Sequence, residues 1–329
     1  MGQPFDATGL ATFLGPLTGF RRRRNLVWRL AVGRGGLGGR MAWVPGMGRR
    51  STVRRCAVVV AVLLTLAGCG APAKSSTPSG SAAEPVGLIA IGHSALTGHG
   101  TAEPPQAGLQ YSWATGTNPK VNSIYLRLVK VRPEDKGHVA NTAIDGATAS
   151  ALDGEAKAAL RQVSAPALVI ISIIGNDIRC DGTDKQHVPE FGQDVRGALD
   201  TITEKSPNSR ILVLGRMGTP SPALTRAIVA RDPNAQYAVT GSGICDFYNV
   251  AGELVPSHFK TLTAIIEAYE AEQARVCAKY RQCHTDGGAR AAYQDKLEDF
   301  APDWIHHNIA GQNAEAAITW PVVEKILGL

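Results

Sequence analysis

The sequence predicts an α/β fold, a three-layer α/β/α sandwich in which helices cover both faces of a mostly parallel sheet. Short apolar runs that end near glycine or a polar turn are typical of buried parallel strands, and longer helical stretches separate them. The expected strands are Val86–Gly92, His138–Ile144 (the weakest), Ala167–Ile174 and Ile211–Gly215. The expected helices are Gly154–Val163, Gln193–Glu204, about His258–Tyr280, and Asn313–Leu327. Pro321 is expected to bend the last helix or to begin a new one. Such sheets bind ligands beyond the carboxyl ends of their strands.

The net charge of the chain is unevenly distributed. Residues 1–68 contain eleven Arg and one acid, Asp6, and carry +10, whereas the remainder carries −4. The overall charge of +6 therefore reflects the N-terminal segment, and we expect no nucleic-acid binding by the folded part.

The N-terminal segment contains an export signal. Residues 57–67 form an apolar run of eleven (AVVVAVLLTLA), preceded by four arginines and followed by Leu-Ala-Gly-Cys. The run is too short to span a membrane comfortably, but it fits a signal peptide. Its ending resembles a bacterial lipobox, in which Cys69 would become the first mature residue and carry a lipid. An ordinary signal peptide with a chance cysteine is the alternative.

These features divide the chain into four segments. Residues 1–46 precede the signal and are interpreted as an upstream extension, with Met41 or Met47 as the true start; a disordered Arg-rich tail is the alternative. Residues 47–68 are the lipoprotein signal peptide. Residues 69–85 are rich in Ser, Ala, Gly and Pro and form a flexible linker. Residues 86–329 form the folded domain.

Four cysteines lie in the folded domain, and an even number in an exported chain favours disulfides. Cys277 and Cys283 would close a short loop at a helix end, which leaves Cys180 to pair with Cys245. We expect no metal site, because the chain has no Cys-x-x-Cys and His284 alone is no ligand set.

Polar residues follow three of the predicted strands. Ser94 comes directly after the first strand in the loop GHSALTG, Gly146 follows the weak strand, and Asn176 lies in a Gly-Asn-Asp turn after the third. Near the C-terminus, Asp303 and His306 are spaced Asp-x-x-His. Each pattern is common by itself, and Asp-x-x-His is more often a surface pair or helix cap than a catalytic pair.

Taken together and in this order, the four segments resemble the SGNH (GDSL-like) hydrolase family, whose signature is four blocks that carry Ser, Gly, Asn and His. The resemblance covers about residues 86–329, and Tyr111–Leu128 is similar to exported actinobacterial members. It implies a flavodoxin-like sandwich with a sheet of about five strands.

The resemblance implies a role for each of these residues. Ser94 would attack an ester carbonyl, His306 would take and later return its proton, and Asp303 would orient the imidazole. The backbone N–H groups of Ser94 and Gly146 and the side-chain amide of Asn176 would hold the oxyanion.

The sequence departs from the family at two positions. His93 stands where the family usually has Asp, and it is an alternative base; we favour His306 because Asp303 precedes it at the expected spacing. His307 stands where Pro often follows the catalytic histidine, and we expect it to be a solvated loop residue. His99 and Trp113 are candidates to line the pocket.

The function expected from the resemblance is that of an exported serine esterase or lipase acting on a lipid or an acylated carbohydrate. The alternatives are an acyltransferase or carbohydrate deacetylase on the same fold, and a non-catalytic binding lipoprotein, which only His93 favours. We expect no cofactor, an extracytoplasmic location, a lipid anchor at Cys69 and a monomer.

Overall fold

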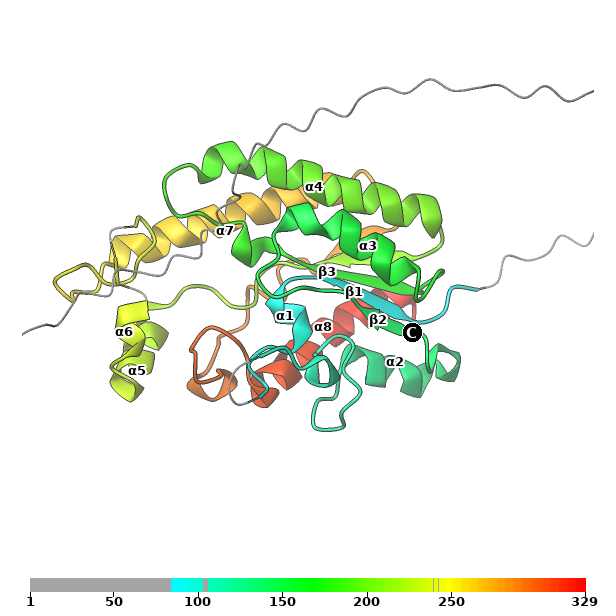
Figure 1. Cartoon of the computed structure of the whole chain (residues 1–329), viewed down its shortest axis with the longest axis horizontal. Helices are drawn as coiled ribbons and strands as arrows, with labels where there is room; N and C mark the ends of the chain where they lie inside the picture. Colours follow the sequence, from blue (N-terminus) through cyan, green and yellow to red (C-terminus); the bar gives the residue numbers. More distant parts are fainter. Residues whose placement is uncertain (1–83, 103–105, 239, 242) are drawn as a thin grey trace, which may run out of the picture. The chain divides into compact units, whose positions relative to one another are not determined.

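The computed structural model describes residues 84–102, 106–238, 240–241 and 243–329 (Figure 1). The predicted export signal, Cys69 and all but the end of the linker lie outside these residues. Within the described residues, no helix has both the length and the apolar character needed to cross a membrane.

The centre of the domain is a five-stranded, all-parallel sheet with the order β2-β1-β3-β4-β5. Its strands are β1 (Leu88–Gly92), β2 (Val139–Asn141), β3 (Leu168–Ser172), β4 (Arg210–Val213) and β5 (Cys283–Thr285). The predicted α/β sandwich is confirmed, and the first four strands fall where the apolar runs predicted them. The sequence analysis missed β5, which has three residues and pairs only with β4.

Each central strand is buried on both faces, and alternate residues point to opposite sides of the sheet. Ile89 and Ile91 of β1 belong to one hydrophobic core, and Leu88 and Ala90 belong to the other. Because the side chains on both faces are buried, nearly every position of these strands is apolar, and the sequence does not alternate between apolar and polar residues.

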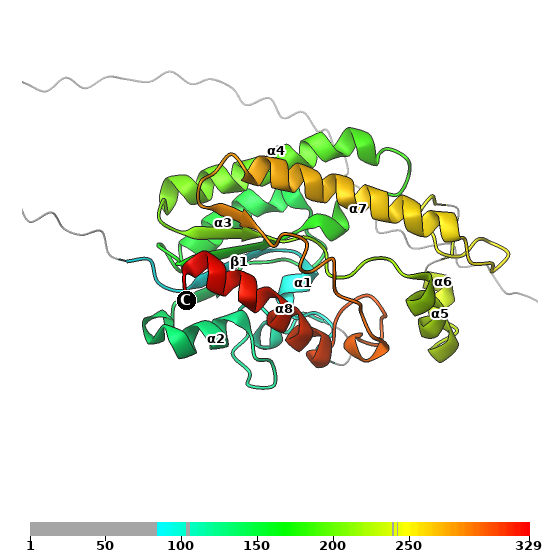
Figure 2. The same ribbon diagram turned by 180° about the vertical axis from the view of Figure 1, so that it is seen from behind.

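Helices cover both faces of the sheet. Figures 1 and 2 show α3, α4 and α7 on one face and α2 and α8 on the other. The helices are α1 (Ser94–Thr97), α2 (Ile124–Val131), α3 (Leu152–Leu160), α4 (Asp184–Lys205), α5 (Pro222–Arg231), α6 (Ala235–Ala238), α7 (Pro256–Cys277) and α8 (Ile309–Leu327). Pro321 lies inside α8, which continues through it, so the expected new helix does not form there.

The carboxyl ends of the strands bring distant segments to one edge of the sheet. Ser94 begins α1 directly after β1, Gly146 follows β2, and Asn176 ends a short 3-10 turn after β3. The loop that precedes α8 carries Asp303 and His306. All of the predicted site residues therefore lie on loops or helix starts at this edge, where parallel sheets bind ligands.

Candidate active site

Ser94 is presented by a sharp turn between β1 and α1. Gly92 makes this turn possible, because it adopts φ +139° and a Cβ there would lie 1.9 Å from the backbone oxygen of Ser172. Only glycine fits such a close approach of two backbones. The Ser94 side chain lies 2.8 Å from His306, measured from Oγ to Nε2. The structure therefore brings together two residues 212 positions apart in the sequence.

His93, at the position where the sequence departs from the family pattern, caps the helix that Ser94 begins. Its Nδ1 accepts a hydrogen bond from the backbone N–H of Ala95 at 3.1 Å. An aspartate at an N-cap would accept the same kind of bond, so the histidine retains the capping function. Burial lowers the pKa of His93 to about 4; the negative charge of Glu315 opposes this shift and the positive charge of Arg290 adds to it. His93 is therefore neutral at pH 7 and a weak base.

Asp303 and His306 form a compact turn before α8. One carboxylate oxygen of Asp303 accepts hydrogen bonds from the backbone N–H groups of Ile305 and His306, both at 3.0 Å. The other oxygen contacts His306 Nδ1 at 2.7 Å. Partial burial acts to raise the pKa of Asp303, but these hydrogen bonds outweigh it and hold the pKa below its usual range.

The ionised carboxylate of Asp303 determines which ring nitrogen of His306 carries the proton. A carboxylate only accepts hydrogen bonds, so Nδ1 of His306 must be the donor. In the neutral ring Nε2 is then the acceptor, and the hydroxyl of Ser94 donates to it. This is the protonation state that a general base needs before it removes the serine proton.

Trp304, one of the two residues between Asp303 and His306, is held in an unusual backbone conformation. Trp304 has φ +56°, which is uncommon for a residue with a side chain, and its indole N–H donates to Asp232 at 3.0 Å. The positive φ of Trp304 is therefore a local backbone strain in the turn that carries Asp303 and His306.

Three hydrogen-bond donors face the same edge of the sheet as Ser94. The side-chain amide of Asn176 donates to the backbone oxygen of Ala147 at 3.0 Å, which orients the amide and leaves its second N–H free among the described residues. Gly146 adopts φ +77°. Within the described part of the chain, neither the backbone N–H of Gly146 nor that of Ser94 donates a hydrogen bond. All three groups are thus free to bind an oxyanion.

A second carboxylate–histidine pair, which the sequence analysis missed, connects the Gly146 loop to the Ser94 helix. Asp145 accepts hydrogen bonds of 2.6 Å from the Thr97 hydroxyl and from Nδ1 of His99. The His99 ring also packs against that of His306, with centroids 4.2 Å apart. Asp145 directly precedes Gly146 in the sequence, but it lies 46 positions after His99, and no motif spacing predicts a contact between residues so far apart.

His99, Asp303 and His306 lie close enough together to hold one metal ion. Binding an ion would however break contacts already made, because His306 uses Nδ1 for Asp303 and Nε2 for Ser94. The arrangement favours proton transfer between Ser94 and His306 over metal coordination.

Among the described residues, two disulfides are present, Cys180–Cys245 and Cys277–Cys283. The first connects the segment after Asn176 to the loop before α7, and the second connects the end of α7 to β5. Disulfides of this kind are typical of exported proteins.

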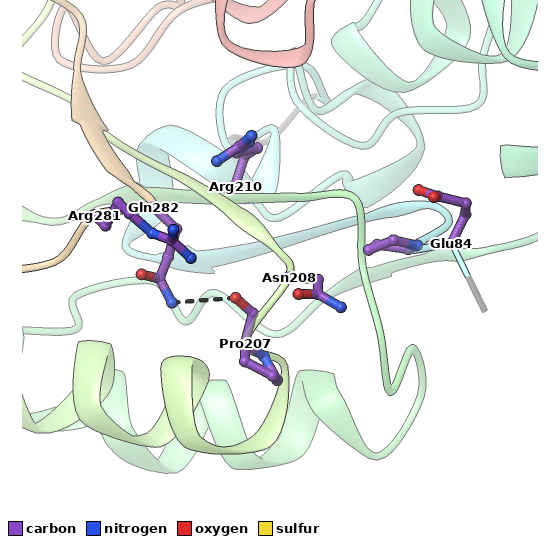
Figure 3. A pocket seen from close by; sticks show the side chains of 7 residues that line it. Glu84, Pro207, Asn208, Arg210, Arg281 and Gln282 are labelled. Atoms are coloured by element: carbon purple, nitrogen blue, oxygen red, sulfur yellow. Dashed lines mark hydrogen bonds between the residues drawn. The ribbon is translucent and has the colours of Figure 1, made fainter. Parts of the chain in front are cut away.

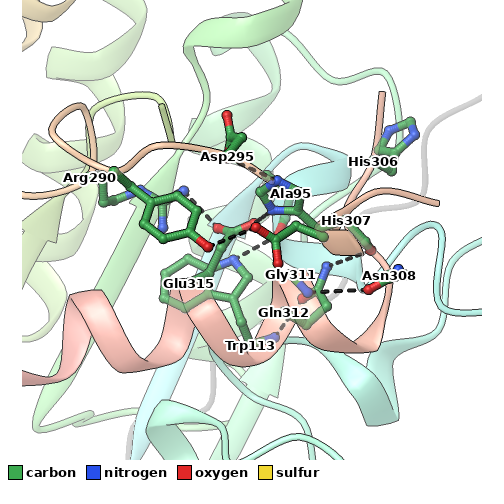
Figure 4. A network of polar contacts seen from close by, with 12 residues as sticks. Ala95, Trp113, Arg290, Asp295, His306, His307, Asn308, Gly311, Gln312 and Glu315 are labelled. Atoms are coloured by element: carbon green, nitrogen blue, oxygen red, sulfur yellow. Dashed lines mark hydrogen bonds and ion pairs between the residues drawn. The ribbon is translucent and has the colours of Figure 1, made fainter. Parts of the chain in front are cut away.

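His307 is not the solvated loop residue expected from the sequence. Its side chain is 9% exposed and lies between two carboxylates, with Nδ1 2.7 Å from Glu315 and Nε2 3.5 Å from Asp295 (Figure 4). The expectation was wrong because Glu315 on α8 and Asp295 in the loop after β5 fold back over this position, and neither is an immediate neighbour of His307 in the sequence. Trp113, a candidate to line the pocket, is fully buried in the core.

Two pockets lie at opposite edges of the sheet, and one of them is close to Asp303 and His306. One of about 1060 Å³ lies beside the Asp303–His306 turn and is lined mainly by apolar residues, among them Phe300, Trp304 and Ile309, with Arg231, Asp232 and Glu298 as its charged residues. The other, of about 590 Å³, lies at the opposite edge of the sheet, where β4 begins at Arg210 (Figure 3). The lining of the first pocket includes Trp304, which lies in the turn between Asp303 and His306, whereas no residue that lines the second pocket lies at the edge of the sheet that carries this turn. The first pocket is therefore the candidate for substrate binding.

Comparisons with known proteins identify the family of this chain. The family model described as GDSL-like Lipase/Acylhydrolase matches residues 88–318. No curated protein matches the chain. Similar solved structures include an extracellular lipase from Streptomyces rimosus, at 17% identity and TM-score 0.43 over 73% of this chain and 99% of that chain. A psychrotrophic esterase from a Pseudoalteromonas species has 14% identity and TM-score 0.40 over 74% and 99%. A family two carbohydrate esterase from Clostridium thermocellum has 12% identity and TM-score 0.44 over 74% and 64%.

Proposed function

The chain belongs to the GDSL-like lipase/acylhydrolase family, and on that basis we propose that it is an exported serine esterase that hydrolyses carboxylic esters through Ser94, His306 and Asp303. The observation that carries the proposal is the pair of contacts that links these side chains. Ser94 Oγ lies 2.8 Å from His306 Nε2, and His306 Nδ1 lies 2.7 Å from Asp303. Both distances are those of hydrogen bonds; the serine proton would move along the first, and the second orients the imidazole.

In the first half of the reaction, His306 Nε2 removes the hydroxyl proton as Ser94 Oγ bonds to the ester carbonyl carbon. The ring becomes an imidazolium, which the ionised carboxylate of Asp303 stabilises. The carbonyl oxygen becomes an oxyanion, and the N–H groups of Ser94, Gly146 and Asn176 would donate to it. His306 then returns its proton to the departing alkoxide as the carbon–oxygen bond breaks, which leaves an acyl group on Ser94.

In the second half, His306 acts in the same way on water. Nε2 takes a proton from the water molecule as its oxygen attacks the acyl carbon, and the same donors hold the second oxyanion. When the intermediate collapses, His306 returns the proton to Ser94 Oγ and the carboxylic acid leaves. The cycle needs no group beyond these side chains and backbone donors.

The substrate we propose is an ester of a lipid or of an acylated carbohydrate. The apolar pocket beside the Asp303–His306 turn supports this proposal, because an apolar lining favours an acyl chain or the aliphatic face of a sugar. A series of p-nitrophenyl esters of increasing acyl length would identify which chain the pocket accepts.

The test is hydrolysis of a short p-nitrophenyl ester by the purified protein. We expect Ser94→Ala to abolish hydrolysis and labelling by a fluorophosphonate probe. Ser257→Ala, which changes an exposed serine on α7, is the matched control and should retain both. Normal turnover by Ser94→Ala would refute the proposal. Transfer of the acyl group to an added alcohol or sugar in place of water would instead identify an acyltransferase.

We further propose that Cys69 is lipidated and attaches the domain to the outer side of the cell membrane through residues 70–85. The lipobox-like sequence supports this proposal. Cys69→Ala should release the protein from the membrane fraction, and mass spectrometry of the wild-type N-terminus should find a diacylglyceryl cysteine. An unmodified N-terminus would contradict it.

A further inference from the structure

A buried polar network extends from Ala95 to His307, the chain neighbours of Ser94 and His306 (Figure 4). It consists of Trp113, Arg290, Glu315 and His307, and none of these side chains is more than 9% exposed. Arg290 and Glu315 are a charged pair in the interior. Such pairs are costly to bury, so their position next to the active site calls for an explanation.

The network connects the neighbour of Ser94 to the neighbour of His306. The indole N–H of Trp113 donates to the backbone oxygen of Ala95 at 2.8 Å. The guanidinium of Arg290 lies over the Trp113 ring, 4.9 Å from its centroid, and donates to Glu315 at 2.7 Å. The other oxygen of Glu315 contacts His307 Nδ1 at 2.7 Å.

Gln312 makes a second connection between the same two segments. Its side-chain oxygen accepts from the backbone N–H of Trp113 at 2.9 Å, and its amide donates to the backbone oxygen of His307 at 3.4 Å. Gln312 is 1% exposed, so water does not compete for these bonds. His307 is thus attached to α8 twice, through its side chain to Glu315 and through its backbone carbonyl to Gln312, which also binds Trp113.

A protonated His307 supplies a positive charge between two carboxylates. Two carboxylates face His307, Glu315 from α8 and Asp295 from the loop after β5, and Phe300 packs against its edge. Arg290 neutralises one of these carboxylates from the far side of Glu315. Arg216 also acts on Asp295, but it interacts with Glu270 as well, so a neutral His307 would leave the carboxylates of this region short of one positive charge, which is unfavourable in the interior.

We propose that His307 is a positioning residue: as a buried imidazolium it holds the loop of His306 against Glu315 and, through Arg290 and Trp113, at a fixed distance from Ser94. This inference rests on the proposed esterase function. The network touches neither the substrate nor the reacting atoms, and its role is to keep Nε2 of His306 within 2.8 Å of Ser94 Oγ.

The protonation of His307 supports this role over the working pH range. Burial acts to lower the pKa of His307, but the contacts with Asp295 and Glu315 outweigh it and raise the pKa to about 9. The imidazolium is therefore intact at neutral pH and is lost in alkaline solution, where the His306 loop would lose its charged partner.

The experiment compares wild type with His307→Gln, which keeps a hydrogen-bond donor and removes the charge. At pH 7 we expect kcat for a p-nitrophenyl ester to fall about 10- to 100-fold with KM unchanged, because misplacement of a catalytic group by about 1 Å costs rate by such factors. The fluorophosphonate labelling rate should fall by the same factor. Wild-type kcat/KM should decline above about pH 9, and the variant should show no decline there. His187→Gln on α4 is the control and should behave as wild type.

A second measurement does not depend on whether the variant folds. Nitrogen-15 NMR of the eight histidines in the wild-type protein should find one that stays protonated at pH 8 and titrates together with the loss of activity. The inference is overturned if no histidine is protonated at pH 8, or if His307→Gln labels as fast as wild type. A wild-type protein that the probe does not label would overturn the proposed function itself.

Discussion

Glu155 on α3 carries a buried carboxylate directly below the Ser94 turn. One of its oxygens accepts a 2.6 Å hydrogen bond from the backbone N–H of Gly92, and the other is buried with no partner among the described residues. The residue is 3% exposed. Burial raises the pKa of Glu155 to about 7, although the hydrogen bond from Gly92 acts in the opposite direction.

This raised pKa makes the stability of the domain depend on pH. The native state binds the proton of Glu155 more tightly than the unfolded chain, whose glutamate has a pKa near the ordinary value of about 4.3. The stabilisation is therefore complete below about pH 4 and is lost as the pH rises through about 7. At about 1.4 kcal/mol per pKa unit, Glu155 should remove about 2 to 3 kcal/mol of unfolding free energy between pH 5 and pH 8.

The test is urea unfolding of wild type and Glu155→Gln at both pH values. Gln keeps the acceptor for Gly92 and cannot ionise. The difference in unfolding free energy between pH 5 and pH 8 should therefore be smaller in the variant by about 2 to 3 kcal/mol. Glu204→Gln, at an exposed position on α4, is the control and should leave the difference unchanged. Equal differences in wild type and Glu155→Gln would refute the reasoning.

Three further predictions concern the site and its support. Asp303→Asn should lower kcat by about 10⁴ with little change in KM, because an amide in this place favours the wrong tautomer of His306; steady-state ester kinetics would contradict this if the loss were below tenfold. Asn176→Ala should lower kcat about 10²- to 10³-fold through the loss of one oxyanion donor, and an unchanged kcat would show that the amide does not contact the oxyanion. Replacement of Cys180 and Cys245 by Ala opens a loop of 65 residues and should cost about 4 kcal/mol in urea unfolding; a midpoint equal to that of wild type would argue against it.

The fold was predictable because its signals are local. The strands around Ile89, Ile170 and Leu212 are continuous apolar runs, and a run of this kind indicates a buried parallel strand without any tertiary information. Strand β5 contains only Cys283–Thr285, one residue of which is buried, so it forms by pairing with β4 and has no apolar run of its own.

The candidate site was predictable only in part. The order of Ser94, Gly146, Asn176 and His306 along the chain resembles a known pattern, and these assignments stay predictions until the variants are made. Contacts between distant segments, such as Asp145 with His99, have no signature in one sequence because the fold alone brings the two side chains together.

Ser94 and its partner His306 each have a histidine as a neighbour in the sequence, namely His93 and His307. The surroundings of these two histidines give them roles other than that of base. Nδ1 of His93 accepts the backbone N–H of Ala95, so protonation at that nitrogen would break the helix cap. His307 has the opposite surroundings, because two carboxylates hold it as a cation. A histidine that must remain neutral and one that must remain charged are both unsuited to gaining and losing a proton in each cycle.

His306 differs from both because its surroundings tolerate either protonation state. Asp303 accepts from Nδ1 whether or not Nε2 carries a proton, so the ring keeps its orientation while the charge on it changes. Its side chain is 21% exposed, which leaves the imidazolium partly solvated during the reaction. Among these three imidazoles, proton exchange at Nε2 of His306 alone leaves the supporting hydrogen bonds intact. The roles of the three histidines therefore follow from what each ring nitrogen contacts. His306 and His307 are adjacent in the sequence and still have different roles, because their ring nitrogens contact different groups.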